Sequence, residues 1–214
     1  MGEREKGELS IAVAASLRDD HITNAVAVIS DVGIDRAITS GALDGVPIIG
    51  ALTGLFRAGK EISGHLFLRQ VVRFLKGVEE LSRAERNAYA DKVFAGGEAE
   101  RFGEALLLLV QKSDEIDKPK LMARAFVAHV RGQFDYPTFL RLSLLINRCV
   151  FADLHRLREF RDGVQDDPEA AERLFVAGFL TSGGFDGGGA NQEEQPGGTV
   201  YYLSGSGRLL APLV

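Results

Sequence analysis

The sequence has little cysteine and no tryptophan, and Cys149 is its single cysteine among 214 residues. One cysteine cannot form an intrachain disulfide, so a disulfide-stabilised fold is excluded. Cys149 lies in the apolar run 144–150. Because unpaired cysteine is among the most often buried residue types, we predict a buried thiol here rather than a nucleophile.

Long apolar runs are also missing. A membrane-spanning helix needs about 20 largely apolar residues, and the best stretch, 46–56, lies between Asp44 and Arg57. The start of the chain, 1–8, is charged and glycine-containing and lacks the apolar region of a signal peptide. These features predict a cytoplasmic protein, with attachment to the inner face of the membrane left open.

Metal-binding and calcium-binding patterns are absent. None of the four histidines has a second histidine or cysteine at ligand spacing, so we predict no metal site. They are His21, His65, His129 and His155. The acids of 114–117 lack the central glycine of a calcium loop, and we interpret them as the acidic start of a helix.

Patterns typical of nucleotide binding and catalysis are incomplete. Residues 54–60, GLFRAGK, match the glycines and lysine of a phosphate-binding loop. The next position must supply a hydroxyl for magnesium, and here it is Glu61. No G-x-S-x-G motif occurs. The sequence therefore predicts no catalytic residue and no cofactor, and favours a non-enzymatic protein.

What the chain has in quantity is apolar and charged residues in helical patterns. It is 45% hydrophobic and 26% charged with a net charge of -5, which is ordinary for a globular protein. Apolar positions recur at helical spacing from Ile62 to Val78. Ser82 and Glu85 form a capping-box pattern that begins the next helix, and Gly96-Gly97 ends it. Further helices are predicted over 99–111, 120–130 and 138–160.

The segment 41–62 differs from the other helices. Its glycines include two pairs with a spacing of four residues, which lets two helices pack closely; the pairs are Gly41 and Gly45, then Gly50 and Gly54. Apolar residues surround them and basic residues follow, as in segments that bind anionic lipid. The contact residues predicted are Ile48, Ile49, Leu52, Leu55, Phe56, Arg57, Lys60, Arg69 and Arg73. A hairpin buried in the protein's own core is the alternative.

The C-terminal part, 162–214, has a different composition. It has two basic residues against eight acids, whereas 120–161 has eight basic residues against three acids. We predict a helix over 168–180, a glycine-rich loop over 183–198, a strand from Thr199 to Ser204 and a short closing helix. The string YYLSGSGRLL, 201–210, resembles the Y-x-L-T-x-x-G-x-x-L string that closes the wing of a winged-helix domain.

Affinity for DNA comes mainly from lysine and arginine contacts to phosphates. The helix expected after residue 168 offers only Arg173, and the following loop carries acids. The best nucleic-acid candidates lie before it: Arg148, Arg156, Arg158 and Arg161. They fall around a helix rather than on one face, so a solvated surface is favoured over a nucleic-acid contact. Because the helix and loop of the tail are acidic or neutral, we expect the tail to bind a protein partner or to pack on the helical body.

Two long runs are similar to a group of uncharacterised bacterial proteins. They are VPIIGALTGLFRAGKEISGHLFLRQVVRFLKGVEELS, 46–82, and the stretch from Phe102 to Arg148. The group has a Pro–apolar–Gly hairpin followed by a helix, and the resemblance extends over about residues 30–212. It implies no catalytic residues, and it suggests a role in bacterial phage defence or stress response.

Together these patterns predict a mainly α-helical protein. A flexible start, 1–8, precedes a bundle-like helical body over 9–161 and a small α+β, winged-helix-like tail over 162–214. The predicted function is non-enzymatic: the hairpin and the following basic helix contact a membrane surface or another protomer. A winged-helix regulator that binds nucleic acid is the alternative.

Overall fold

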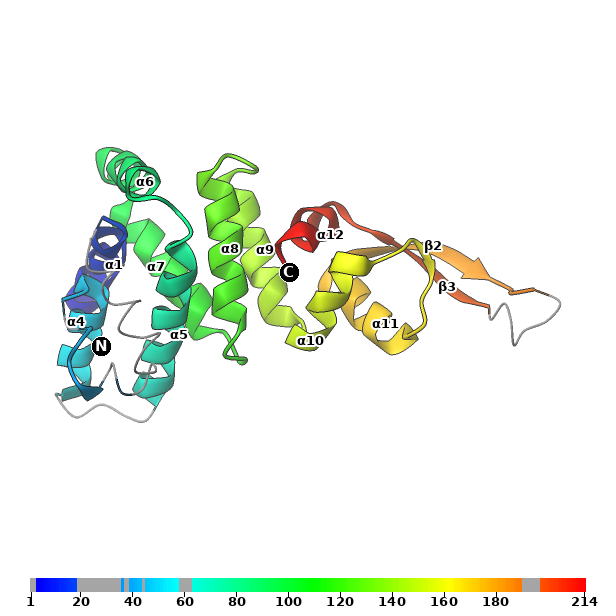
Figure 1. Ribbon diagram of the computed structural model, residues 1–214, viewed down its shortest axis with the longest axis horizontal. Coiled ribbons are helices and arrows are strands. Elements are labelled where there is room, and N and C mark those ends of the chain that lie inside the picture. The colour runs from blue at the N-terminus through cyan, green and yellow to red at the C-terminus, as the bar shows by residue number, and fades with distance from the viewer. Residues whose placement is uncertain (1–2, 19–35, 37–38, 44, 58–62, 190–196) are drawn as a thin grey trace. The chain divides into compact units, whose positions relative to one another are not determined.

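The computed structural model describes residues 3–18, 36, 39–43, 45–57, 63–189 and 197–214. The chain forms two compact units, Met1–Gln133 and Phe134–Val214. Helices dominate both, and the second unit also contains a three-stranded antiparallel sheet (Figure 1). The prediction of a mainly α-helical protein is therefore confirmed. Within the described residues, no helix has the length and apolar character needed to cross a membrane.

The N-terminal unit is built from helices. They are α1 (Glu3–Leu17), α4 (Pro47–Arg57), α5 (Ser63–Val78), α6 (Arg83–Ala95), α7 (Ala99–Gln111) and α8 (Lys118–Val130). Helix α1 packs against α7 and α4, and α5 packs against α8. Because α1 begins at Glu3, residues 3–8 are helical rather than a flexible start. The predicted helix over 99–111 coincides with α7.

The start of α6 follows the predicted capping box. The Glu85 amide donates to Ser82 Oγ at 3.2 Å, and the Ser82 amide donates to Glu85 Oε2 at 2.7 Å. Arg131, just after α8, donates from Nε to Glu85 Oε1 at 3.1 Å and from Nη2 to the Glu80 carbonyl at 2.8 Å. The capping box of α6 thus also binds the residue that follows α8.

Two helix pairs approach closely at glycines. A Cβ atom placed on Gly103 of α7 would lie 1.9 Å from the carbonyl oxygen of Ser10 in α1. One placed on Gly77 of α5 would lie 2.4 Å from the Cβ of Ala123 in α8. Aromatic rings fill the space among α5–α8, with Phe126 at the centre of the cluster. Small residues at the crossings and large ones between them define this core.

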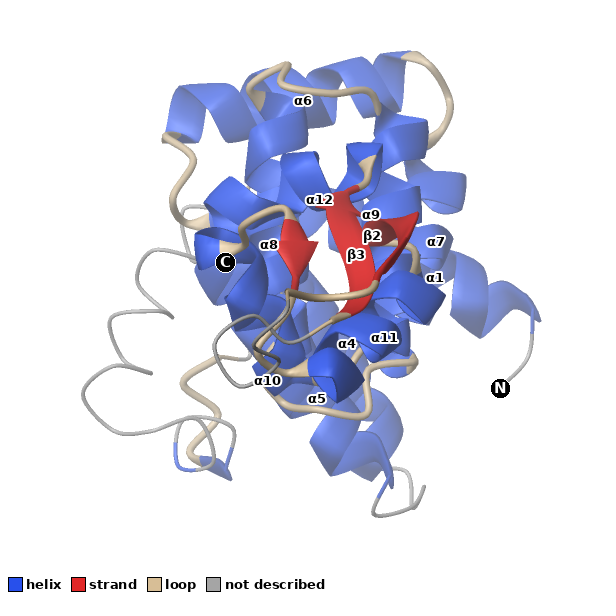
Figure 2. Ribbon diagram, turned by 90° about the vertical axis from the view of Figure 1, so that its right-hand side faces the viewer, coloured by secondary structure: helices blue, strands red, loops and turns tan. Residues whose placement is uncertain are grey.

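The C-terminal unit contains shorter elements. They are α9 (Tyr136–Arg148), α10 (Phe151–Leu154), the 3-10 helix η1 (His155–Glu159), β1 (Gly163–Val164), α11 (Pro168–Ala177), β2 (Leu180–Asp186), β3 (Gly198–Leu203), α12 (Gly205–Leu210) and η2 (Ala211–Leu213). The antiparallel sheet has the order β1-β3-β2, with Leu180 opposite Leu203 and Gly163 opposite Tyr201. Figure 2 shows β3 between its two neighbours.

The structure corrects three predicted boundaries. The helix predicted over 138–160 is interrupted, because Cys149 and Val150 adopt extended backbone angles. Residues of the predicted glycine-rich loop form part of β2. The second unit begins at Phe134 rather than at 162, since α9 and α10 belong to it. Cys149 is buried, as predicted.

Helix α11 ends where the sequence contains a glycine. Gly178 has a φ of 95°, in the left-handed region that favours glycine, and its amide donates to the Leu174 carbonyl. The predicted helix therefore stops at Ala177 instead of 180. Phe179 and Leu180, which follow, are buried and lead directly into β2. At the other end, Ser204 caps α12 by accepting from the Gly207 amide at 3.0 Å.

Candidate functional site

The apolar segment predicted to make an external contact lies largely in the core. The side chains of Ile48, Ile49 and Leu52 are 0%, 1% and 3% exposed. Helix α4 packs against α1, and the Ile48 amide donates to the buried Ser16 Oγ at 3.0 Å. These three residues thus stabilise the N-terminal unit, which was the alternative left open by the sequence. The prediction that these three residues contact a membrane or a partner is therefore wrong.

Other parts of that prediction have different outcomes. Gly41 and Gly45 lie in the turn before α4, with Gly41 at a φ of 73°, whereas Gly50 and Gly54 lie inside the helix. The four glycines therefore do not form one helical stripe. The side chains of Leu55, Phe56 and Arg57, and the whole of Lys60, are outside the described residues.

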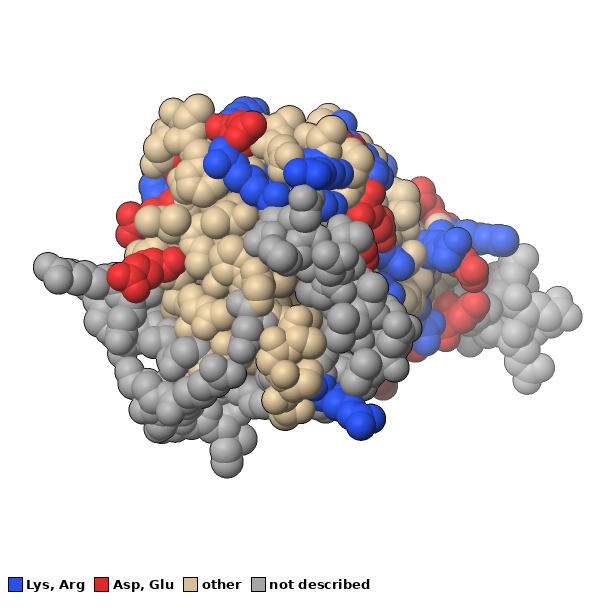
Figure 3. Space-filling model, turned by 60° about the vertical axis from the view of Figure 1, so that its left-hand side comes forward, with Lys and Arg blue, Asp and Glu red and all other residues tan. Residues whose placement is uncertain are grey.

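The predicted basic face is partly used within the protein. Arg73 Nη1 lies 2.9 Å from Asp117 Oδ1, which links α5 to the residue before α8. Arg69 is half-buried. On the face drawn in Figure 3, Lys and Arg lie among Asp and Glu rather than forming one continuous basic area.

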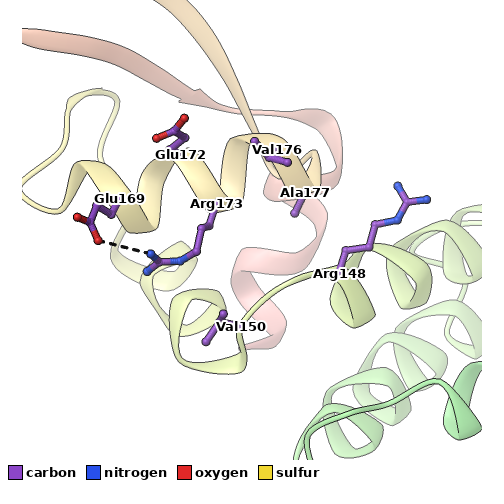
Figure 4. A pocket seen from close by; sticks show the side chains of 7 residues that line it. All are labelled: Arg148, Val150, Glu169, Glu172, Arg173, Val176 and Ala177. Atoms are coloured by element: carbon purple, nitrogen blue, oxygen red, sulfur yellow. Dashed lines mark ion pairs between the residues drawn. The ribbon is translucent and has the colours of Figure 1, made fainter.

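An open groove in the C-terminal unit is a candidate site formed entirely by described residues. It has a volume of about 690 Å³ and lies between the end of α9, the link to α10, and α11 (Figure 4). Its lining residues are Arg148, Val150, Glu169, Glu172, Arg173, Val176 and Ala177. All belong to one compact unit, so the groove does not depend on the placement of the other unit.

A two-point ion pair fixes one side of the groove. Arg173 Nε lies 2.7 Å from Asp153 Oδ2, and Arg173 Nη2 lies 3.0 Å from Asp153 Oδ1. The Asp153 side chain is buried, and Glu169 Oε2 lies 3.9 Å from Arg173 Nη1. The hydrogen bond to Asp153 raises the pKa of Arg173. The positive charge of this arginine is therefore already neutralised within the protein.

The exposed part of the groove contains two valines beside the half-exposed Arg173, with further charged residues toward its ends. Val176 is 77% exposed and Val150 is 48% exposed. Figure 4 shows Glu169 and Glu172 on one side of these valines and Arg148 on the other. Within the described residues no ion pair engages Arg148. The groove thus combines solvent-exposed apolar surface with unneutralised charges of both signs.

The four arginines predicted as nucleic-acid contacts precede α11 and have different surroundings. Arg148 lines the groove. Arg156 Nη2 lies 2.7 Å from Asp167 Oδ2 at the start of α11. A backbone hydrogen bond from Ala170 is the main cause that lowers the pKa of Asp167, and Arg156 contributes. Arg158 and Arg161 are exposed.

Sequence reasoning missed this groove. Val150 falls inside the continuous helix predicted over 138–160, whereas in the structure it lies at the break after α9 and is exposed. Neither glycine nor proline marks that break in the sequence. In the sequence, Val176 stands three and four residues before the apolar Phe179 and Leu180, so its spacing gave no sign of its exposure.

Comparison with known proteins does not assign the chain to a family. No protein family, curated protein or solved structure matches the chain. Among the described residues, no group of three or more His, Cys, Asp or Glu side chains is placed to hold a metal ion. The groove on α11 is therefore interpreted from its own geometry.

Proposed function

We propose that this is a non-enzymatic protein-binding protein whose C-terminal unit is winged-helix-like and binds a protein surface with α11. The element order supports the winged-helix comparison. A helix is followed by the two-stranded hairpin β2–β3, and the string 201–210 closes the hairpin and begins α12.

The observation that carries the proposal is the charge state of α11. In helix-turn-helix proteins the second helix enters the major groove of DNA, and basic side chains contact the phosphates. Arg173 is the sole basic residue of α11, and it is already paired with Asp153. Glu169 and Glu172 are exposed on the same helix and would repel phosphates.

Apolar exposure on α11 favours a protein partner instead. Val176 and Phe175 are 77% and 41% exposed. Exposed apolar side chains surrounded by polar ones are typical of surfaces that bind other proteins. Membrane contact through α4 is not part of the proposal, because its apolar residues Ile48, Ile49 and Leu52 are buried. A role in phage defence stays a prediction from the sequence resemblance.

Site-specific photo-crosslinking tests this function. A photoreactive amino acid replaces Val176, and a matched control carries it at the exposed Ala84 of α6. We expect a discrete protein adduct from position 176 that disappears when Glu172→Arg is added, and no such adduct from position 84.

Fluorescence anisotropy with labelled duplex DNA at low salt supplies the opposing measurement. The proposal predicts no saturable binding. Saturable binding that weakens with salt and is lost in Arg148→Glu or Arg158→Glu would favour the nucleic-acid alternative. Absence of any protein adduct at position 176 would also contradict the proposal.

A further inference from the structure

We infer that the groove on α11 binds the same groove of a second copy of this chain, forming a twofold dimer. The inference rests on the proposed function, because it names the protein partner of that site. It is drawn from the distribution of charge along the groove: Glu169 and Glu172 are at one end and Arg148 is at the other.

A twofold interface joins one surface patch to itself in the opposite direction. Each charged end of the groove then meets the other end of the second groove. Arg148 of one protomer faces the partner's Glu172, and Glu172 faces the partner's Arg148. Both charges are exposed and Arg148 has no ion pair within the described residues, so both are available for this contact.

The two valines of the groove, which lie on either side of the Asp153-paired Arg173, fit the same arrangement. Val150 and Val176 are exposed to solvent in the isolated chain. Under a twofold axis through the middle, these valines lie against the valines of the second groove and leave water. Apolar burial in the centre with charges at the rim is the usual composition of a protein interface.

A partner whose charged residues all have the same sign complements this groove less well than a second copy does. A uniformly basic segment would pair with Glu169 and Glu172 but would meet Arg148 at the other end. A uniformly acidic segment would meet the two glutamates. Arg173 does not change this comparison, because Asp153 already neutralises its charge. The second copy satisfies both ends, and like-charge contacts exclude many other partners.

Charge reversal tests the inference on the full-length protein. Sedimentation velocity is measured over a concentration series from about 1 to about 500 µM. We expect the wild type to pass from its 23.1 kDa monomer to a dimer with rising concentration. Arg148→Glu alone and Glu172→Arg alone each place like charges opposite each other twice. Each should weaken the dimer at least about tenfold.

Two combinations should restore association. An equimolar mixture of Arg148→Glu and Glu172→Arg chains places opposite charges at both ends of a heterodimer. A single chain that carries both substitutions does the same in a homodimer. Both should return to within about threefold of wild-type affinity. Arg158→Glu, an exposed charge outside the groove, should leave the dimer unchanged.

Three results would overturn the inference. They are a wild type that stays monomeric at all concentrations, a dimer that tolerates both single reversals, and a mixture that fails to regain affinity. Circular dichroism of each variant verifies that the fold is retained. A monomeric wild type that still gives a protein adduct at position 176 overturns the self-association alone, and the proposed function stands. A monomer without that adduct overturns both.

Discussion

Arg173 on α11 holds the buried carboxylate of Asp153 on α10 with two hydrogen bonds, of 2.7 and 3.0 Å. Asp153 has little access to water, whereas Arg173 is about half exposed. Loss of the arginine leaves a buried carboxylate without its cation, which is costly. The pair therefore positions α11 and, with it, one side of the groove.

The first prediction concerns this pair. Arg173→Gln should lower the thermal unfolding midpoint, because Asp153 stays buried and charged. Arg173→Gln combined with Asp153→Asn should lower it less, since no unpaired charge remains. Differential scanning calorimetry of the two variants and of Asp153→Asn completes a double-mutant cycle. Additive effects of the two substitutions would show that the ion pair does not couple the helices.

The second prediction concerns the contact between α1 and α7. Gly→Ala inside a helix normally stabilises it by about 1 kcal/mol. At Gly103 the added Cβ would lie 1.9 Å from the carbonyl oxygen of Ser10, so the helices must move apart. We expect Gly103→Ala to destabilise the protein by about 1–3 kcal/mol in urea unfolding.

The matched control is Gly205→Ala at the start of α12. Apart from its chain neighbours and the backbone of its own helix, no described atom lies within 4 Å of a Cβ at that position, and its φ is not positive. We expect a change below about 0.5 kcal/mol there. If Gly103→Ala instead raised the stability, the close packing of α1 on α7 would be refuted.

The third prediction is a pH dependence of the capping box. Hydrogen bonds from Ser82, followed by that from Arg131, lower the pKa of Glu85 from 4.5 to about 2. A carboxylate with a lowered pKa stabilises the folded state above its unfolded value, and this stability is lost as the pH falls. The advantage of wild type over Glu85→Gln should thus be present at pH 6, decrease below about 4.5, and vanish near pH 2.

Thermal unfolding of both proteins across this range measures the advantage. Glutamine retains hydrogen-bonding capacity at the helix start, so the comparison isolates the charge. An advantage that stays constant from pH 6 to pH 2 would mean that Glu85 is not held ionised by its neighbours.

The fourth prediction concerns a buried lysine. The side chain of Lys118 is fully buried, and its Nζ lies 2.5 Å from Asp114 Oδ1 and 3.3 Å from Glu115 Oε1. The hydrogen bond from Lys118 lowers the pKa of Asp114. Both carboxylates are partly exposed and can be hydrated if the lysine is removed.

Lys118→Met should therefore change the unfolding free energy by less than about 1 kcal/mol, because an apolar side chain of similar length fills the space. The double variant Asp114→Asn, Glu115→Gln should cost about 2 kcal/mol or more, since the buried ammonium loses both anions. Chemical denaturation compares them. The reverse order of the two effects would refute this account.

Local sequence signals predicted the helices well. The capping box at Ser82 and Glu85 and the glycines that follow bound α6, and the apolar stretch 105–110 lies in α7. Each of these features depends on residues a few positions apart. Their structural outcome is therefore determined by the segment itself, largely independent of what packs on it.

Burial and the groove could not be predicted in the same way. The apolar pattern of α4 is compatible with an external contact or with a core, and the outcome depends on α1, whose Ser16 bonds the Ile48 amide. The groove requires the break at Cys149 and Val150 and the ion pair between Arg173 and Asp153. The ion pair joins residues of two separate helices, where spacing carries no signal, and no glycine or proline marks the break.

The most direct test of the account is a concentration series of amide NMR spectra of the uniformly labelled protein, repeated with duplex DNA. If the α11 groove binds the groove of a second copy, the amides of 148–150 and 169–177 should shift or broaden as the protein concentration rises. The amides of α6 should not change, and added DNA should shift no amide of α11. Spectra independent of protein concentration, with DNA-induced shifts on α11, would contradict the account.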